Sequence, residues 1–185
     1  MLFRSFYKQF EKVYSRSAEY FDILKDDIKL PQNKLHILKA GTDIGSFHIK
    51  YKEEGFWRAY EGIDNDSIKL LYVGRLTKEK NFPFLLDMWD TLLGKTDKNI
   101  ELICCGEGKI LDEKAALKNK KVHLLGYKGG EELSKIYANS DIFLFPSTTD
   151  TLGQVVMEAQ SSALPALVSN IGGPKIGRAS CRERV

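Results

Sequence analysis

The sequence contains few of the residues that build disulfides or metal sites. Its 185 residues include only three cysteines and three histidines. Cys104 and Cys105 are adjacent, and adjacent residues of a strand point to opposite faces, so they form neither a ready disulfide nor a metal clamp. We interpret them as small buried residues and expect a reducing, cytoplasmic compartment. The histidines are scattered, with no carboxylate or cysteine at ligand spacing, so we expect no bound metal.

A strong charge of one sign and a long apolar run are both missing. The formal net charge of +3 becomes zero without residues 175–185, which hold four basic residues and one acidic residue. Composition therefore gives no support for a nucleic-acid partner. No stretch approaches the roughly 20 apolar residues of a membrane-spanning helix. The apolar fraction of 43% suits one globular domain with a sizeable core.

The last residues do not resemble the rest of the protein. Residues 175–185 match the translation of a common DNA-sequencing adapter. We expect them to be an artefact and leave them out of the fold.

Apolar runs alternate with amphipathic segments over most of the chain. The pattern predicts strands at 35–38, 68–73, 100–105, 122–125, 141–145 and 165–169. It predicts helices at 81–93, 107–118, 130–139 and 153–162. Residues 51–66 are interpreted as a polar link. Continuous apolar strands separated by helices indicate an α/β fold, a Rossmann-like parallel sheet covered by helices on both faces. Ligands of such sheets bind beyond the carboxyl ends of the strands.

The most informative segment begins at Asp150, in the loop after the strand 141–145. A helix follows Gly153, and Glu158 lies about one and a half turns into it. The amides around Leu152–Gln154 form the amino end of that helix, where N–H groups and the dipole favour an anion. One carboxylate can bind hydroxyls on one side of this anion and the second carboxylate on the other. The layout suits a sugar nucleotide.

Two motifs carry a resemblance to a known family. Residues 147–159, continuing to 163–165 and 171–174, resemble the E-x7-E signature of retaining GT-B glycosyltransferases of group 1, with Asp150 at the position of the first Glu. Residues 68–81 resemble the strand, GR and KN segment of the same family.

The resemblance implies roles for three catalytic residues. Arg75 and Lys80 would hold the donor diphosphate through charge-assisted hydrogen bonds, each worth about 1.5–3 kcal/mol. They would also stabilise the negative charge that develops on the departing nucleotide. Asp150 would contact the sugar hydroxyls; the alternative interpretation is an acidic residue that only favours the start of a helix.

The resemblance also implies a substrate-binding set. Glu158 would bind the ribose hydroxyls, the amides near Leu152 and Gly153 the phosphates, and the loop at Gly126 and Tyr127 would approach the nucleotide base. The implied set is Gly74, Gly106, Gly126, Tyr127, Leu152, Gly153 and Glu158. Ordinary strand-to-helix turns remain the alternative for Gly106, Gly126 and Tyr127, and a solvated helix residue for Glu158.

The resemblance further implies a domain organisation and an activity. Residues 1–15 would be a remnant of the N-terminal acceptor domain, and 16–174 an incomplete C-terminal nucleotide-sugar-binding domain. The full-length enzyme would transfer a sugar from a nucleotide-diphosphate donor with retention of configuration, without metal or other cofactor. Its acceptor would be a glycan, a lipid or a small molecule, and its location cytoplasmic or peripheral to the membrane. The chain without the missing N-terminal domain would bind donor weakly and transfer nothing.

The sequence also admits other functions. A sugar-nucleotide epimerase on the same two-domain plan and a non-catalytic nucleotide-binding module both remain open. Asp64-Asn65-Asp66 is a D-x-D triplet, the metal–diphosphate motif of GT-A glycosyltransferases, but it precedes a strand instead of following one. Paired carboxylates also occur in glycosidases, although Glu158 beside a phosphate-binding helix terminus argues against that class.

Overall fold

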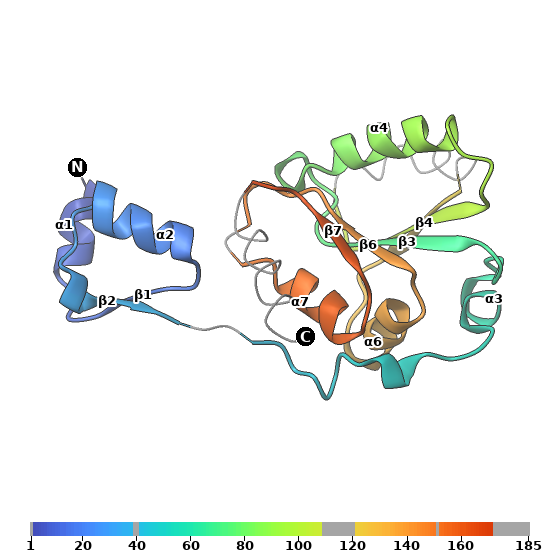
Figure 1. Cartoon of the computed structure of the whole chain (residues 1–185), viewed down its shortest axis with the longest axis horizontal. Helices are drawn as coiled ribbons and strands as arrows, with labels where there is room; N and C mark the ends of the chain where they lie inside the picture. Colours follow the sequence, from blue (N-terminus) through green and yellow to red (C-terminus); the bar gives the residue numbers. More distant parts are fainter. Residues whose placement is uncertain (1, 39–40, 109–120, 151, 172–185) are drawn as a thin grey trace.

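A computed structural model of the chain describes residues 2–38, 41–108, 121–150 and 152–171. Its main feature is a five-stranded parallel sheet with the strand order β5-β4-β3-β6-β7 (Figure 1). The strands are β3 (Ile68–Val73), β4 (Ile100–Cys105), β5 (Val122–Gly126), β6 (Ile142–Phe145) and β7 (Ala166–Val168). The predicted α/β class and parallel sheet are confirmed.

Helices cover both faces of this sheet. Helix α4 (Phe82–Leu93) packs on one face, and α3 (Phe56–Glu61), α6 (Gly130–Ala138) and α7 (Gln154–Ser161) lie on the other (Figure 1). The helix predicted over 107–118 falls mostly on residues outside the described part of the chain. Among the described helices, none is both long enough and apolar enough to span a membrane.

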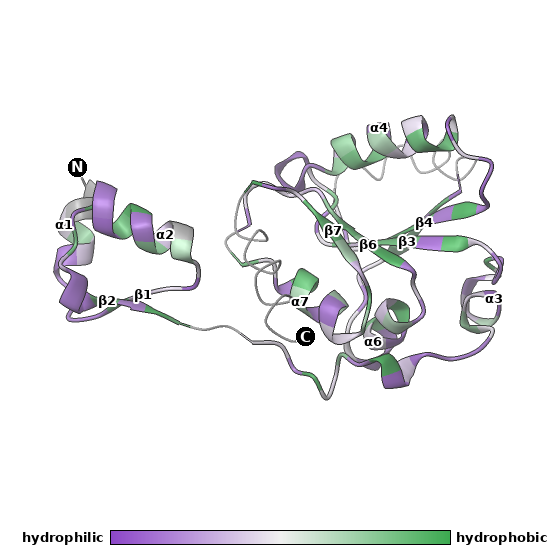
Figure 2. Ribbon diagram, in the orientation of Figure 1, coloured by the Kyte–Doolittle hydropathy of each residue, from purple (hydrophilic) through white to green (hydrophobic). Residues whose placement is uncertain are grey.

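The alternation of side chains along β3 and β4 divides the core in two. Leu70 and Tyr72 face α4, while Leu71 and Val73 face α6 and α7. Both strands are apolar at nearly every position because both of their faces are covered. Figure 2 shows this concentration of hydrophobic residues along the central strands.

The region 51–66 is not the polar link that the sequence pattern predicted. It contains α3, whose Phe56 and Trp57 are buried in the core beneath α6. Gly55 and Gly62 bound the helix with φ of 73° and 66°, values that suit glycine. The indole N–H of Trp57 donates to the Asn139 carbonyl oxygen at 2.6 Å. Two aromatic side chains within a polar stretch are enough to anchor this short helix.

A smaller unit precedes the sheet. It consists of α1 (Leu2–Lys8), β1 (Val13–Ser15), α2 (Ala18–Asp22) with the π-turn Ile23–Asp27, the 3₁₀ turn Gln32–Lys34 and β2 (Leu35–Ile37). Strands β1 and β2 pair in parallel. Its own core is formed by Val13, Leu24, Leu30 and Leu35. The unit thus continues beyond the predicted boundary at residue 15, and its assignment to an acceptor domain stays a prediction.

Candidate functional site

The predicted site residues gather at the carboxyl edge of the sheet. Because the strands are parallel, the turns after β3, β4 and β5 lie at the same edge. Backbone hydrogen bonds join them, from Gly74 N to the Cys105 oxygen at 2.9 Å and from Gly106 N to the Gly126 oxygen at 2.7 Å. The structure therefore brings three predicted glycines, Gly74, Gly106 and Gly126, together.

Close backbone approach explains the glycine at position 106. A Cβ atom there would lie 1.9 Å from the Gly74 carbonyl oxygen, and the residue has a φ of 144°. A Cβ at Gly108 would lie 2.1 Å from the Leu76 carbonyl oxygen. The Gly106-Glu107-Gly108 turn thus has a packing role, and ligand contact there stays a prediction.

An ion pair joins the two predicted motifs across the sheet edge. Lys80 Nζ lies 2.8 Å from Asp150 Oδ1, and their side chains are only 14% and 23% exposed. Lys80 ends the 3₁₀ turn Lys78–Lys80 after β3, whereas Asp150 lies in the loop after β6. Within the described part of the chain, the buried Oδ2 of Asp150 has no hydrogen-bond partner. The pair thus presents a shielded cation beside an unused carboxylate oxygen.

Arg75 is exposed in the structure. Its guanidinium pairs with Glu79 at 2.9 Å, and the Arg75 side chain is 61% exposed. A surface pair of this kind contributes about 0–1 kcal/mol, so little free energy opposes its exchange for another anion. The Arg75 backbone is more firmly held, because the buried Tyr72 hydroxyl donates to its carbonyl oxygen at 2.9 Å.

Asn81 is a site residue to which the sequence pattern assigned no role. Its side-chain amide donates to the Pro146 carbonyl oxygen at 3.2 Å, and its φ is 57°. This bond ties the turn after β3 to the loop after β6, and so holds Lys80 beside Asp150. The sequence does carry a signal for this turn, an Asn before Phe-Pro at a helix start. Asn adopts the left-handed conformation more readily than most residues, so it suits such a turn.

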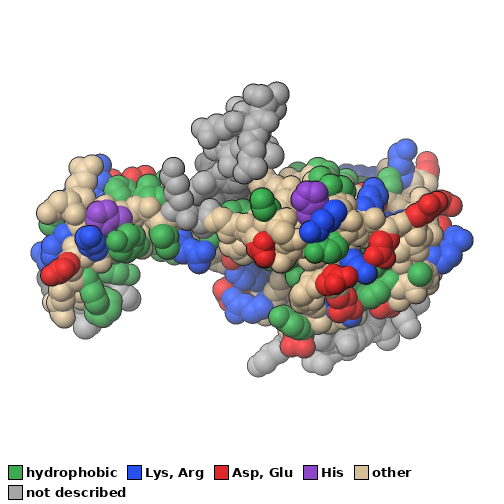
Figure 3. All heavy atoms as spheres, turned by 90° about the horizontal axis from the view of Figure 1, so that it is seen from below, with side chains coloured by type: hydrophobic (Ala, Val, Ile, Leu, Met, Phe, Trp, Pro, Cys, Tyr) green, Lys and Arg blue, Asp and Glu red, His purple; other side chains and the backbone are tan. Residues whose placement is uncertain are grey.

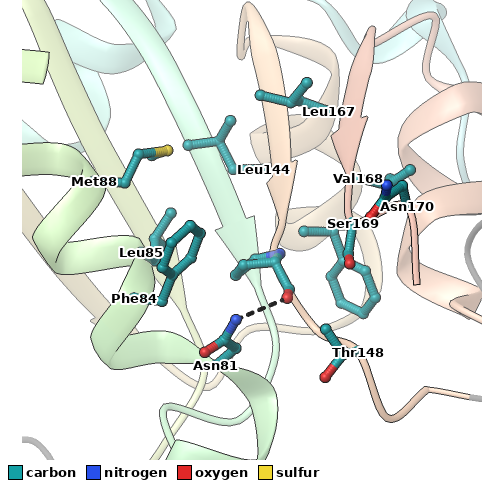
Figure 4. A pocket seen from close by; sticks show the side chains of 12 residues that line it. Asn81, Phe84, Leu85, Met88, Leu144, Thr148, Leu167, Val168, Ser169 and Asn170 are labelled. Atoms are coloured by element: carbon teal, nitrogen blue, oxygen red, sulfur yellow. Dashed lines mark hydrogen bonds between the residues drawn. The ribbon is translucent and has the colours of Figure 1, made fainter. Parts of the chain in front are cut away.

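An apolar pocket of about 410 Å³ lies next to this site, between α4 and the ends of β6 and β7 (Figure 4). Phe84, Leu85 and Met88 contribute from the helix, and Leu144 and Leu167 from the strands. Asn81 and Thr148 stand at its polar end. None of the predicted site residues lines the pocket, so it borders the carboxyl-edge site without containing it.

The amino end of α7 is capped by Gly153. This glycine has φ 68° and ψ 55°, and no side-chain hydrogen bond from the described residues caps the helix. Within the described ranges, the first amides of α7 therefore have no side-chain acceptor, which makes them suited to an anion. Leu152 is half-buried and Gly153 is buried.

Glu158 is not a freely solvated helix residue. Its Oε2 accepts a hydrogen bond from the Tyr137 hydroxyl at 3.1 Å, between α7 and α6. Burial raises the pKa of the Glu158 carboxyl, and the hydrogen bond from Tyr137 acts against that rise. Tyr127, in contrast, is 76% exposed after β5. Its contact with a ligand stays a prediction.

The D-x-D triplet lies at the opposite edge of the sheet. Asp64–Asp66 precede β3. The Asp64 carboxylate accepts hydrogen bonds from the Asp66 backbone amide and the Asn99 side-chain amide, and it pairs with Arg58 at 3.6 Å. Among the described residues, no group of three or more His, Cys, Asp or Glu side chains could hold a metal ion.

The sheet and the residues at its carboxyl edge define a class of domain. An open parallel sheet with glycine turns and a cation–carboxylate pair at its carboxyl edge is a Rossmann-like α/β domain with a candidate nucleotide site. The family model for glycosyl transferases group 1 matches residues 53–176. The chain belongs to this family, and its sheet is part of a GT-B fold.

Individual relatives agree with this assignment. The chain is 29% identical over 150 residues to the uncharacterized glycosyltransferase MJ1607 of Methanocaldococcus jannaschii, covering 77% of the chain and 38% of the relative. It is 36% identical over 137 residues to a GDP-mannose-dependent alpha-mannosyltransferase of Corynebacterium glutamicum, covering 72% of the chain and 30% of the relative.

The fold also matches a solved structure of Anabaena HepE in complex with UDP and glucose. The TM-score is 0.74 at 18% identity, over 95% of this chain and 49% of that one. At this identity the likeness shows the fold alone. The chain thus spans less than half the length of these relatives.

Proposed function

We propose that this chain is the donor-binding part of a glycosyltransferase that uses a nucleotide-diphosphate sugar. The observation that carries the proposal is the shielded Lys80–Asp150 pair at the carboxyl edge of the sheet. Both of its residues come from the motifs that resemble the family, and they meet where ligands of parallel sheets bind.

Each group at this edge has a role in the proposal. Lys80 binds the diphosphate, and the first amides of α7 bind the same phosphates from the other side. Arg75 exchanges its weak surface partner Glu79 for the phosphate. Cations held near the diphosphate act most strongly on the leaving group, whose negative charge increases as the glycosidic bond breaks.

The two carboxylates bind the two ends of the donor. The buried, unpartnered Oδ2 of Asp150 accepts from sugar hydroxyls, and Glu158 accepts from the ribose hydroxyls. Tyr127 and the Gly126 turn lie beside the base. In this proposal, transfer retains the anomeric configuration and uses no metal.

The acceptor site belongs, in this proposal, to the rest of a longer protein. The relatives are more than twice as long as the aligned part of this chain. The chain itself belongs to the group 1 glycosyl transferases. HepE was solved with UDP and glucose, and the Corynebacterium relative is named for GDP-mannose. The proposed donor is therefore a UDP or GDP sugar, and the proposed location is the cytoplasm or the membrane surface.

A comparison of donors with nucleotides tests this assignment. The affinity of the chain for UDP, GDP, UDP-glucose and GDP-mannose would be measured by ligand-observed NMR, which suits weak binding. Lys80→Met should weaken both the nucleoside diphosphates and the sugar nucleotides by about 10-fold or more, because each loses a charge-assisted hydrogen bond.

Asp150→Asn should weaken the sugar nucleotide relative to its nucleoside diphosphate, because Asp150 is assigned to the sugar. Lys121→Met is the matched control, since Lys121 precedes β5 at the opposite edge and its Nζ donates to Asn99 Oδ1. Equal binding by the wild-type, Lys80→Met and Lys121→Met chains would overturn the proposal.

A further inference from the structure

Tyr137 is a buried residue with a polar group directed at the candidate site. Its side chain is fully buried in the core on the α6 side of the sheet. Its hydroxyl nevertheless donates to Glu158 Oε2 at 3.1 Å. Neither of the two family-like motifs, residues 68–81 and 147–159, includes Tyr137.

The Tyr137 ring is held from two directions. Phe47 contacts it edge-on, with ring centroids 5.6 Å apart and an interplanar angle of 87°. Phe143 of β6 packs at 5.7 Å. A ring fixed in this way presents its hydroxyl in one direction, because the phenol oxygen lies on the axis of the ring.

Phe47 belongs to the segment that leads from the smaller unit into the sheet domain. The same segment is attached at residues 51 and 53, where the Asn139 side chain donates to the Tyr51 carbonyl and accepts from the Glu53 amide. The segment 41–54 therefore packs on α6 directly behind Tyr137.

We propose that Tyr137 is a positioning residue for Glu158. Its hydroxyl fixes one carboxylate oxygen, Oε2, so that Oε1 remains available to hydroxyls of the ligand. Phe47 holds the Tyr137 ring in place, and so connects segment 41–54 to the donor site. The inference rests on the proposed function, in which Glu158 binds ribose hydroxyls.

Electrostatics give this contact a second effect. Burial raises the pKa of Glu158, and the donor hydrogen bond from Tyr137 lowers it, so the hydroxyl favours the charged carboxylate. Tyr137 stays neutral, because burial and the nearby Glu158 raise the pKa of its phenol. Cys105 of β4 lies behind Tyr137, and burial raises the pKa of its thiol to about 12, so it is also neutral. Among the residues that the structure describes, Tyr137 is the titratable group that acts on Glu158.

The first experiment needs no ligand. The carboxyl of Glu158 is titrated by ¹³C NMR in the wild-type chain and in Tyr137→Phe, which keeps the ring and removes only the hydroxyl. The Glu158 pKa should move upward in Tyr137→Phe. The matched control is Tyr60→Phe, which removes a Tyr-to-Glu hydrogen bond between α3 and Glu132 and should leave Glu158 unchanged. The same Glu158 pKa in all three chains would overturn the proposal.

The second experiment measures recognition of ribose. Binding of UDP is compared with that of 2′-deoxy-UDP, and binding of GDP with that of 2′-deoxy-GDP, as a function of pH. The wild-type chain should prefer the ribonucleotide by about 10-fold, the effect of one hydrogen bond to a charged group. Tyr137→Phe should reduce this preference, because Oε2 is no longer held, and the reduction should be greatest at the low end of the pH range, because the Glu158 pKa is higher in the variant.

The Glu158→Gln variant separates the role of Tyr137 from the ribose-binding role of Glu158. Loss of the ribose preference in Glu158→Gln, with wild-type behaviour of Tyr137→Phe at every pH, would overturn the role of Tyr137 and leave the proposed function standing. An unchanged ribose preference in Glu158→Gln would overturn the ribose-binding role of Glu158, and the inference with it. Only the loss in Glu158→Gln combined with the pH-dependent loss in Tyr137→Phe supports the positioning role.

Discussion

At the residue scale, the glycine that follows β4 and the glycine that ends β5 differ in what surrounds them. A Cβ at Gly106 would lie 1.9 Å from the Gly74 oxygen, whereas a Cβ at Gly126 would meet no atom within 4 Å. Both residues have positive φ, 144° and 73°. Only the first position combines an unfavourable conformation with a backbone collision.

We therefore predict that Gly106→Ala destabilises the chain by about 3 kcal/mol or more, because β3 and β4 must separate at the site. The matched variant Gly126→Ala should cost about 1–2 kcal/mol, the penalty for the left-handed conformation alone. Urea denaturation gives both values. Equal losses for the two variants would show that the close approach of Gly106 to Gly74 is not a constraint.

The half-buried Glu158 predicts an unusual dependence of stability on pH. Its folded-state pKa is raised above its ordinary value, so the folded state binds the proton more tightly than the unfolded state. The contribution of this group to stability is then greatest below the unfolded pKa, and it declines as the pH rises through the folded pKa.

Glu158→Gln removes this decline, because the amide carries no charge to desolvate. We predict that the variant is at least as stable as the wild type at pH 7, while its binding of UDP or GDP falls by about 10-fold. Thermal unfolding between pH 4 and pH 8 measures the first effect. A Gln variant that is less stable at pH 7 but equal to the wild type at pH 4 would contradict this account of Glu158.

At the element scale, the strands were predictable and some of the helices were not. Strands β3 and β4 match the predicted bounds because strands buried on both faces read as continuous apolar runs. Helix α3 was missed because only two of its residues, Phe56 and Trp57, are buried, which is too few for a helical period. The local sequence determines strands β3 and β4, whereas tertiary packing determines helix α3.

The candidate site was predictable in its location but not in its contacts. Parallel strands place the turns after them at one edge, so the positions of Gly74, Gly106 and Asp150 followed from the pattern. The Lys80–Asp150 and Tyr137–Glu158 contacts did not follow, because they depend on β6 lying next to β3 and on α6 packing beside α7. No periodicity encodes such pairings.

Asn139 at the end of α6 joins this helix to segment 41–54. Its side chain bonds to the Glu53 amide and to the carbonyls of Tyr51 and Lys135, at 2.8, 3.1 and 2.8 Å. Asn139→Ala should therefore destabilise the chain by about 2 kcal/mol and increase the rate of amide hydrogen exchange in residues 51–53.

The matched control for that variant is Asn99→Ala. Asn99 also makes side-chain hydrogen bonds, to Asp64 and Lys121, but all of them are exposed. Its loss should stay within about 0.5 kcal/mol. If Asn139→Ala leaves exchange at 51–53 unchanged, the attachment of segment 41–54 to α6 does not depend on this side chain.

At the scale of the whole molecule, charges of both signs are spread over the surface, whereas the candidate site lies at one edge of the sheet. On the face shown in Figure 3, Lys and Arg side chains are interspersed with Asp and Glu. In the proposed function, recognition of an anionic donor depends on groups placed at one sheet edge: the Lys80 cation and the first amides of α7. The two edges of the sheet should differ sharply in their response to a nucleotide.

Backbone amide chemical shifts recorded on addition of UDP or GDP would locate the nucleotide on the sheet. Perturbations should concentrate at the carboxyl edge, in the turns at Gly74, Gly106 and Gly126 and at the start of α7. Amides at the amino edge serve as the internal control: Ser67, Asn99 and Lys121. The account predicts shifts at the first edge that saturate with nucleotide and disappear in Lys80→Met. Shifts centred on the amino edge, or saturable shifts that persist in Lys80→Met, would contradict it.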